Sequence, residues 1–300
     1  MRYGIIKVEA SWTIKDEPMG SKEKFWVRRP VDDQPWLFKF SRVNNGVATG
    51  EHWAEKLAAE FARLLGIPHA RVELATFDDR LGCLSRSFEE LNDPQVELVH
   101  GNELLAGIIE GYDQQQHWGQ HQHTLVNILR AVNEHIAKEQ QAQAFTTICG
   151  FIVLDALILN TDRHHENWAM VRNSANERAM QYHIAPTFDH ASSLGRELEP
   201  SRLSAWQSDS EQVARYANKG RGGVFWLESG RHGENPLMLA QKARRRWPSY
   251  FDTWLDTLKG SGLQVFIDEI HKVPDGCMSA LSKKFVASLV EYSYGRLSKL

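Results

Sequence analysis

A polar run, residues 160–167 (NTDRHHEN), lies between two apolar segments and concentrates residue types that can do chemistry. Asp162 and Asn167 are five residues apart in this run, and a loop that leaves a buried helix and enters a strand can present both side chains to one cleft. A second carboxylate, Asp189, follows 22 residues after Asn167 in the segment TFDHASSLG. One carboxylate can orient an attacking hydroxyl or accept its proton, while an Asn and a second carboxylate supply hard oxygen ligands for Mg²⁺. The spacing therefore indicates metal-assisted phosphoryl transfer.

A lysine in an apolar strand is the second chemical signal. Lys39 lies within WLFKF, where an unpaired ammonium would cost several kcal/mol of desolvation, so it requires a carboxylate or phosphate partner. The helix predicted next in the chain offers Glu51, Glu55 and Glu60, and Glu55, one turn into that helix, is the predicted partner. A strand Lys that is paired with a helix Glu and is free to touch phosphates would complete a nucleotide site.

The elements that must position these residues change character along the chain. The first ninety residues are rich in short alternating or apolar runs bounded by turn residues, which predict strands in GIIKVEA (4–10), KFWVRR (24–29), WLFKF (36–40), RVELATF (71–77) and GCLSRSF (82–88). One helix interrupts them: apolar residues recur at helical spacing from Glu51 to Leu65, and Gly66 with Pro68 provides the stop signal.

After SFEELNDP the pattern becomes helical, first amphipathic and then wholly apolar, in residues 102–112 and 124–159. Two short strands, 168–173 and 181–188, follow the polar run, and residues 279–297 predict a C-terminal helix. We therefore predict an α+β fold of two lobes, in which a β-rich N-lobe (1–92) joins a helical C-lobe (93–300) at Asp93-Pro94.

Composition excludes several classes of function. A formal net charge of −3 provides no global basic field for nucleic acid or anionic membranes. Three cysteines without motif spacing favour a reducing cytosol over a disulfide scaffold. The most apolar segment (148–159) is shorter than the roughly 20 residues needed to cross a bilayer and contains Asp155, so it predicts a buried core helix. We expect a cytoplasmic protein without membrane insertion, although a secreted effector without a cleavable signal would look the same.

Two motifs together resemble a known family. NTDRHHENW followed by APTFDHASSLG, with FKF and AEKLAAEFARLLGIP upstream, resembles the HipA-like serine/threonine kinases over most of the chain, and the DRHxxN pattern is similar to that of phosphatidylinositol 3/4-kinases. The resemblance implies ATP and Mg²⁺ as cofactors, a protein Ser/Thr hydroxyl as acceptor and a small antitoxin protein as partner. Its implied roles are a catalytic base (Asp162), Mg²⁺ ligands (Asn167, Asp189), a phosphate contact (Lys39) and backbone contacts to adenine (Arg86 to Phe88).

The chain departs from this family at its N-terminal side. HipA toxins carry an extra subdomain before the nucleotide loop, whereas this sequence begins almost at that loop. The segment 16–26 (DEPMGSKEKFW) holds one glycine, so its resemblance to the family's phosphate loop depends on Gly20, Ser21 and Lys24. A serine of this loop can be autophosphorylated in the family to inactivate the enzyme, which makes Ser21 the candidate.

Other interpretations of the same residues stay open. A lipid or small-molecule kinase would fit the DRHxxN pattern, and a nucleotide-binding pseudokinase would act as an interaction module. The histidines of the central region match no zinc-ligand spacing. We expect His164 to pack under its loop, the cluster HWGQHQH (117–123) to be solvated, and KARRRW (242–247) to be a solvated helix face without nucleic-acid contact.

Overall fold

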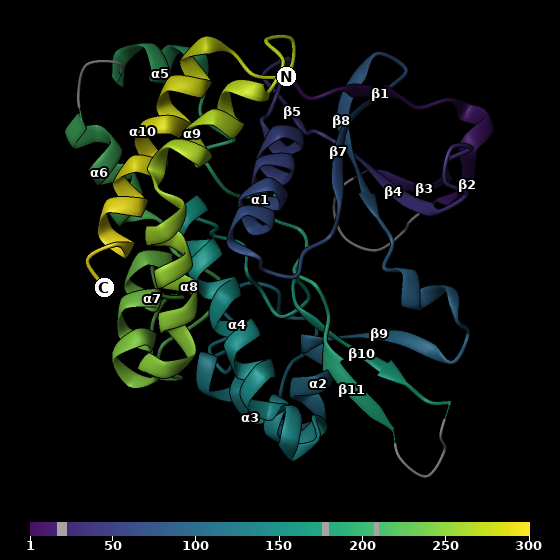
Figure 1. Cartoon of the computed structure of the whole chain (residues 1–300), viewed down its shortest axis with the longest axis vertical. Helices are drawn as coiled ribbons and strands as arrows, with labels where there is room; N and C mark the ends of the chain where they lie inside the picture. Colours follow the sequence, from purple (N-terminus) through teal and green to yellow (C-terminus); the bar gives the residue numbers. More distant parts are fainter. Residues whose placement is uncertain (17–22, 176–179, 207–209) are drawn as a thin grey trace.

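The computed structural model describes residues 1–16, 23–175, 180–206 and 210–300. The N-lobe is built on a six-stranded sheet of order β1-β7-β8-β4-β3-β2, antiparallel except for the parallel pair β1/β7 (Figure 1). Its strands are β1 (Ile5–Lys7), β2 (Thr13–Asp16), β3 (Lys24–Arg28), β4 (Pro35–Phe40), β7 (Val72–Phe77) and β8 (Arg80–Arg86). A two-stranded hairpin, β5 (Val43–Asn44) and β6 (Val47–Ala48), follows β4. Four of the five predicted N-lobe strands are confirmed over most of their length, and the first, predicted over 4–10, is confirmed only over Ile5–Lys7. Strand β2 and this hairpin were not predicted.

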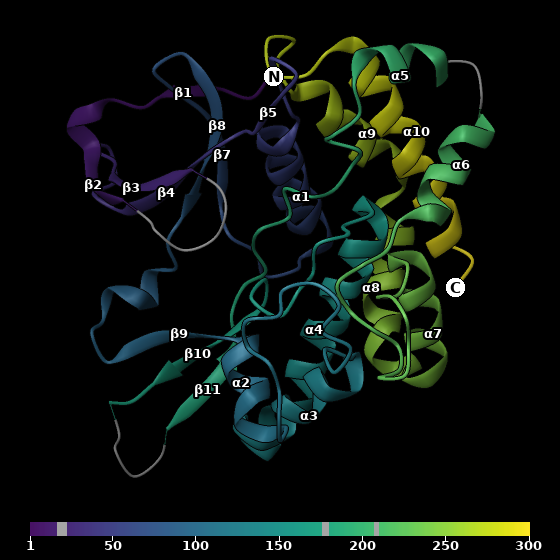
Figure 2. The ribbon, with the colours of Figure 1, turned by 180° about the vertical axis from the view of Figure 1, so that it is seen from behind.

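Helix α1 (Glu51–Leu65) lies between the sheet and the C-lobe helices in both views (Figures 1 and 2). Its predicted bounds are confirmed, and it ends because Gly66 adopts a left-handed conformation with φ 70°. Apolar residues on α1 pack on β7 and β8 on one side and on α8 and α9 on the other, so nearly the whole helix is buried. This packing fixes the position of Glu55.

The C-lobe surrounds one buried helix, α4 (Lys138–Ile158), which packs against α3, α7, α8 and α10. Helix α4 is long and apolar enough to cross a membrane, but most of it is buried among these helices, which confirms the prediction of a core helix. The other helices are α2 (Gly101–Ile108), α3 (Leu125–His135), α5 (Pro200–Trp206), α6 (Ser210–Lys219), α7 (Pro236–Arg246), α8 (Pro248–Ser261), α9 (Leu263–Lys272) and α10 (Ala280–Leu297).

A three-stranded sheet of order β11-β10-β9 lies below the six-stranded sheet in Figure 1. The predicted strands after the polar run are confirmed as β10 (Ala169–Asn173) and β11 (Gln181–Ile184). Strand β9 (Val96–His100) lies just after the predicted lobe boundary, was not predicted, and pairs antiparallel with β10. The chain passes from the large sheet to β9 through a single 3-10 turn, Glu89–Asn92. The predicted lobe boundary at Asp93-Pro94 lies between this turn and β9.

Candidate active site

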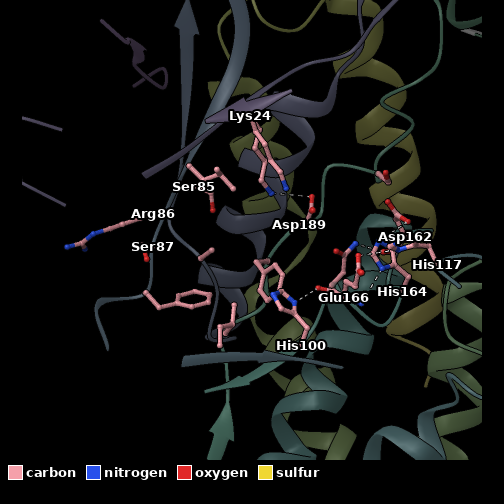
Figure 3. A pocket seen from close by; sticks show the side chains of 18 of the residues that line it. Lys24, Ser85, Arg86, Ser87, His100, His117, Asp162, His164, Glu166 and Asp189 are labelled. Atoms are coloured by element: carbon pink, nitrogen blue, oxygen red, sulfur yellow. Dashed lines mark hydrogen bonds and ion pairs between the residues drawn. The ribbon is translucent and has the colours of Figure 1, made fainter. Parts of the chain in front are cut away.

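A cavity of about 650 Å³ lies between the two lobes and is lined by residues from β3, β4, β8 and β9 and from the two polar loops that flank the hairpin β10/β11 (Figure 3). This volume falls within the range of roughly 300–1,000 Å³ that is usual for small-molecule sites. The structure places in its wall the predicted site residues Lys24, Lys39, Arg86, Phe88, Asp162, Asn167 and Asp189. Residues that are 165 positions apart in the chain thus converge on one site.

The loop after α4 is held by a buried ion pair that sequence reasoning missed. Arg163 donates to both carboxylate oxygens of Asp155 at 2.8 and 2.7 Å, and to the carbonyl of Asn167 at 2.5 Å. Asn160 also donates to Asp155, at 2.9 Å, and its own side-chain oxygen accepts the backbone N–H of Asp162 at 3.0 Å. A carboxylate within an otherwise apolar helix was the signal available in the sequence, since a buried charge requires a partner.

Asp162 and Asn167 occupy the two ends of this fixed loop. The side-chain amide of Asn167 donates to the carbonyl of Asp162 at 2.7 Å, so the amide oxygen is the atom that remains to bind a cation. The carboxylate of Asp162 lies 3.9 Å from the Nε2 atom of His164 and faces the cavity. One residue thus presents a carboxylate and the other an amide oxygen to the same space.

Asp189 approaches from the loop after β11 and forms an ion pair with Lys39, with 3.3 Å between Oδ1 and Nζ (Figure 3). Its backbone has φ 56°, a left-handed conformation that Asp tolerates better than most residues. Burial alone would lower the pKa of Lys39, but the carboxylates of Asp189 and Glu55 outweigh it and raise that pKa. Lys39 is therefore a permanent cation beside Asp189.

Glu55, the predicted partner of Lys39, is fully buried on α1. Its negative charge raises the pKa of Lys39, although less than the charge of Asp189 does. Lys39, Asp189 and Glu55 therefore form one electrostatic cluster. Lys24 is the direct cross-strand neighbour of Lys39 on β3 and also lines the cavity. Two adjacent ammonium groups on the N-lobe face give this wall a positive charge suited to phosphate.

The far end of the cavity is apolar. Trp26, Leu37, Ala70, Phe88 and Phe188 line it, and the rings of Phe88 and Phe188 lie edge to face at 6.2 Å. The backbone N–H groups of Arg86 and Ser87 already donate to carbonyl oxygens of Arg71 and Pro35. Because these two N–H groups are already hydrogen-bonded within the lobe, a backbone contact to adenine would have to use other backbone atoms of this strand end.

The side chain of Arg86 is directed away from Asp162 and Asp189 in Figure 3 and forms an ion pair with Glu89 at 2.7 Å. Gly20 and Ser21, the predicted phosphate-loop residues, lie outside the described residues. The expectation that Ser21 is phosphorylated therefore continues to depend on the family resemblance alone.

In the histidine-rich segment 117–123, the expectation of a solvated cluster is confirmed for His117, Trp118 and His121, which are exposed, and is wrong for His123, which is buried. His123 is 1% exposed, donates to the carbonyl of Gly223 at 2.9 Å and accepts from the indole of Trp168 at 3.0 Å. Burial lowers the pKa of His123 to about 3, so it is neutral. His117 and Trp118 also line the cavity. The sequence could not show this because the partners of these residues lie 40 or more positions away.

The structure also corrects the role expected of His164. His165 is the histidine packed under the loop: it is 1% exposed, its Nδ1 atom is hydrogen-bonded to the hydroxyl of Tyr112 at 2.8 Å, and burial lowers its pKa to about 4. His164 lines the cavity, although its Nδ1 atom still accepts the backbone N–H of Glu166 at 3.2 Å.

The donor set fits Mg²⁺. Asp189 contributes a carboxylate and Asn167 an amide oxygen, the hard ligands that this ion prefers, and the cavity beside them has positive charge for phosphates and an apolar end for a base. The two residues leave further coordination positions for nucleotide oxygens and water, as is usual for Mg²⁺.

Comparisons with known proteins identify the family. The sequence model of the HipA-like C-terminal domain matches residues 17–242, and no curated protein matches the chain. Among solved structures, the Helicobacter pylori proinflammatory kinase CtkA has a TM-score of 0.75 and 19% identity, covering 99% of this chain and 98% of its own.

HipA of Shewanella oneidensis MR-1, solved with HipB and operator DNA, has a TM-score of 0.62 and 11% identity. The match covers 97% of this chain and 66% of the Shewanella chain. Identities this low establish a shared fold, while the sequence model extends over three quarters of the chain. The chain therefore belongs to the HipA-like C-terminal domain family and has the two-lobed α+β kinase-like fold.

Proposed function

We propose that this protein transfers the γ-phosphoryl group of ATP to a serine or threonine hydroxyl of a protein substrate. The observation that carries the proposal is the convergence, in one interlobe cavity, of Asp162, Asn167 and Asp189 from the C-lobe with Lys39 from the N-lobe. The same cavity is also lined by Trp26, Leu37, Phe88 and Phe188, whose apolar side chains suit a purine base. Family membership and the kinase-like fold support the same chemistry.

Each residue has a role in this proposal that follows from its position. Asp162 orients the acceptor hydroxyl and receives its proton, because its carboxylate faces the cavity from a loop fixed by Arg163. Asn167 and Asp189 hold Mg²⁺, which when bound supplies positive charge to the nucleotide phosphates. Lys39 and Lys24 place two further cations on the opposite wall. Catalysis then depends on positioning and electrostatics, since phosphoryl transfer requires little covalent chemistry from the protein.

Residues that were not predicted also contribute to the wall near Asp162. Arg42 and Arg196 line the cavity, and each forms an ion pair with Glu51, at 4.0 and 3.3 Å. Arg196 additionally donates to the hydroxyl of Ser192 at 3.3 Å. These guanidinium groups are placed to favour an anionic substrate segment on the acceptor side of the cavity.

A partner protein is part of the proposal. The Shewanella relative was solved as a complex of HipA, HipB and operator DNA, which supports a small antitoxin protein as a partner here as well. The Helicobacter relative is described as proinflammatory, which supports an effector role as the alternative. Co-purification with the product of a neighbouring helix-turn-helix gene would distinguish the two roles.

The acceptor class is tested by mixing tag-free protein with Mg²⁺·ATP and either a generic protein acceptor or vesicles containing phosphatidylinositol. We expect phosphoserine or phosphothreonine in the protein acceptor and no labelled lipid, because the formal net charge is −3 and α4, the one described helix long and apolar enough to span a membrane, is mostly buried. Labelled lipid without labelled protein would show a lipid kinase. ATP binding without transfer to either acceptor would support a pseudokinase.

A further inference from the structure

Three side chains with metal-binding atoms come together in the wall of the cavity. A nitrogen from each of His117 and His164 and a carboxylate oxygen of Glu166 all lie within 4.8 Å of one another (Figure 3). His117 Nδ1 is already 3.2 Å from Glu166 Oε2. Among the residues that the structure describes, no other three His, Cys, Asp or Glu side chains form such a group.

The residue types in this group favour a transition metal. Two imidazoles and one carboxylate form a ligand set that Zn²⁺ binds, whereas Mg²⁺ prefers oxygen ligands alone. With bonds of about 2.0–2.1 Å, the ligand atoms of a tetrahedral zinc lie roughly 3.3–3.5 Å apart. The His117–Glu166 distance already matches this spacing, and the widest separation in the group must shorten by about 1.5 Å or less.

The structure can provide that adjustment locally. The side chain of His117 is 44% exposed and that of Glu166 is 28% exposed, so both can turn without disturbing the core. The backbone between the other two ligands is fixed, because Glu166 N–H donates to His164 Nδ1 and the carbonyl of Glu166 accepts from His100 Nδ1 at 2.8 Å. Two ligands thus come from a rigid loop and the third from a neighbouring loop that can close on them.

We propose that His117, His164 and Glu166 form a binding site for a zinc-class metal ion, separate from the Mg²⁺ site, and that its occupation inhibits the enzyme. The carboxylate of Asp162 lies 3.9 Å from His164 Nε2 and can supply a fourth coordination position. A metal that recruits Asp162 withdraws it from the acceptor hydroxyl. It also ties the 112–123 loop to the catalytic loop in the wall of the cavity. The inhibitory part rests on the proposed kinase function, and the binding part does not.

Binding is tested on tag-free protein by titration calorimetry with ZnCl₂ alone, and by the visible absorption bands that tetrahedral Co²⁺ acquires. We expect one equivalent to bind to wild-type protein and to His121→Gln, a matched control because His121 is an exposed histidine on the same loop. His117→Gln should weaken binding about tenfold or more, since it removes one of three protein ligands. Equal affinity in His117→Gln and wild type, or no binding by wild type, would overturn the site.

Inhibition is tested by adding Zn²⁺ to assays that contain excess Mg²⁺·ATP, with each variant compared with its own zinc-free rate. Zinc should lower the rates of wild type and His121→Gln, and much less that of His117→Gln, and a zinc-selective chelator should restore them. Equal inhibition of His117→Gln would contradict the regulatory role. If no variant transfers phosphate at all, the proposed function fails while the binding titration still decides the metal site.

Discussion

At the scale of single residues, the site brings together buried charges, each of which would be costly to bury without a partner of opposite sign. Asp189 and Glu55 together hold Lys39 as a buried cation, and Asp189 is also the carboxylate assigned to Mg²⁺. We therefore expect the Lys39–Asp189 ion pair to compete with metal binding, because bound Mg²⁺·ATP would supply a cation for Asp189 and phosphates for Lys39.

Substitution of the metal ligand tests this exchange. Asp189→Asn should weaken Mg²⁺-dependent ATP binding, because it removes a charged oxygen ligand while keeping the size of the side chain. Calorimetric titration of ATP with and without Mg²⁺ measures the effect. Metal-dependent affinity that survives unchanged would exclude Asp189 as a ligand.

Lys39 and Glu55 should behave as a coupled pair. Lys39→Met and Glu55→Gln should each reduce turnover sharply, and the double variant should be little worse than either single one, because both belong to one buried cluster. Initial rates of the four proteins at saturating ATP complete the cycle. If instead the loss of turnover in the double variant equals the product of the two single losses, so that the activation free energies add within about 0.5 kcal/mol, the two residues act independently.

At the scale of elements, the catalytic loop depends on its attachment to α4. Asp155 lies one turn before the end of that helix and receives donors from Arg163 and Asn160, so a single carboxylate fixes the backbone from 160 to 167. Periodicity could predict α4 and the two strands after the loop, since both patterns are local. It could not predict this ion pair, because many residues could have partnered Asp155.

Removal of Asp155 should therefore destabilise the protein as well as inactivate it. Asp155→Ala leaves Arg163 buried without its carboxylate, which should lower the free energy of unfolding by about 3–5 kcal/mol. Urea unfolding of this variant beside Asp256→Ala, an exposed carboxylate on α8, measures the difference. A loss as small as that of the exposed control would show that the ion pair does not hold the loop.

Strand β9 was missed because its pairing is non-local. Strand β9 has five residues and its partner β10 begins about 70 positions later, so only tertiary pairing distinguishes it from the start of a helix. In contrast, α1 was predicted to the residue because its amphipathic spacing and its Gly66 stop are both local. The same distinction applies to the site: residue types indicated Asp162, Asn167 and Asp189, whereas the place of His117 required the fold.

At the scale of the whole molecule, α1 joins the two lobes. His52 on α1 accepts from the hydroxyl of Ser41 at 2.7 Å and donates through Nε2 to the carbonyl of Cys277 at 3.1 Å in the C-lobe. Glu269 on α9 accepts from Arg63 at 2.9 Å and from the hydroxyl of Tyr3. These contacts hold the helix that carries Glu55 against the C-lobe, so the lobes should unfold together.

The buried histidine of this connection makes stability depend on pH. Burial lowers the pKa of His52 to about 4, below the ordinary value of 6.5, so the unfolded chain binds this proton more readily. Stability should be complete above about pH 6.5 and decline as the pH falls towards 4, with about 2 kcal/mol lost at pH 5 from this group. Urea unfolding at several pH values measures the slope, which His52→Gln should reduce and His121→Gln should not. An unchanged slope in His52→Gln would assign the effect to other groups.

The most direct test of the central claim is the rate of phosphoryl transfer by Asp162→Ala. Asp162 lies in the wall of the cavity rather than in the core, so the variant should keep the wild-type unfolding midpoint and circular dichroism spectrum. Its transfer of phosphate from Mg²⁺·ATP to a protein acceptor should fall by about 10²–10⁴-fold, as is typical when a catalytic base is removed. A folded Asp162→Ala protein that phosphorylates the acceptor as fast as wild type would contradict the account.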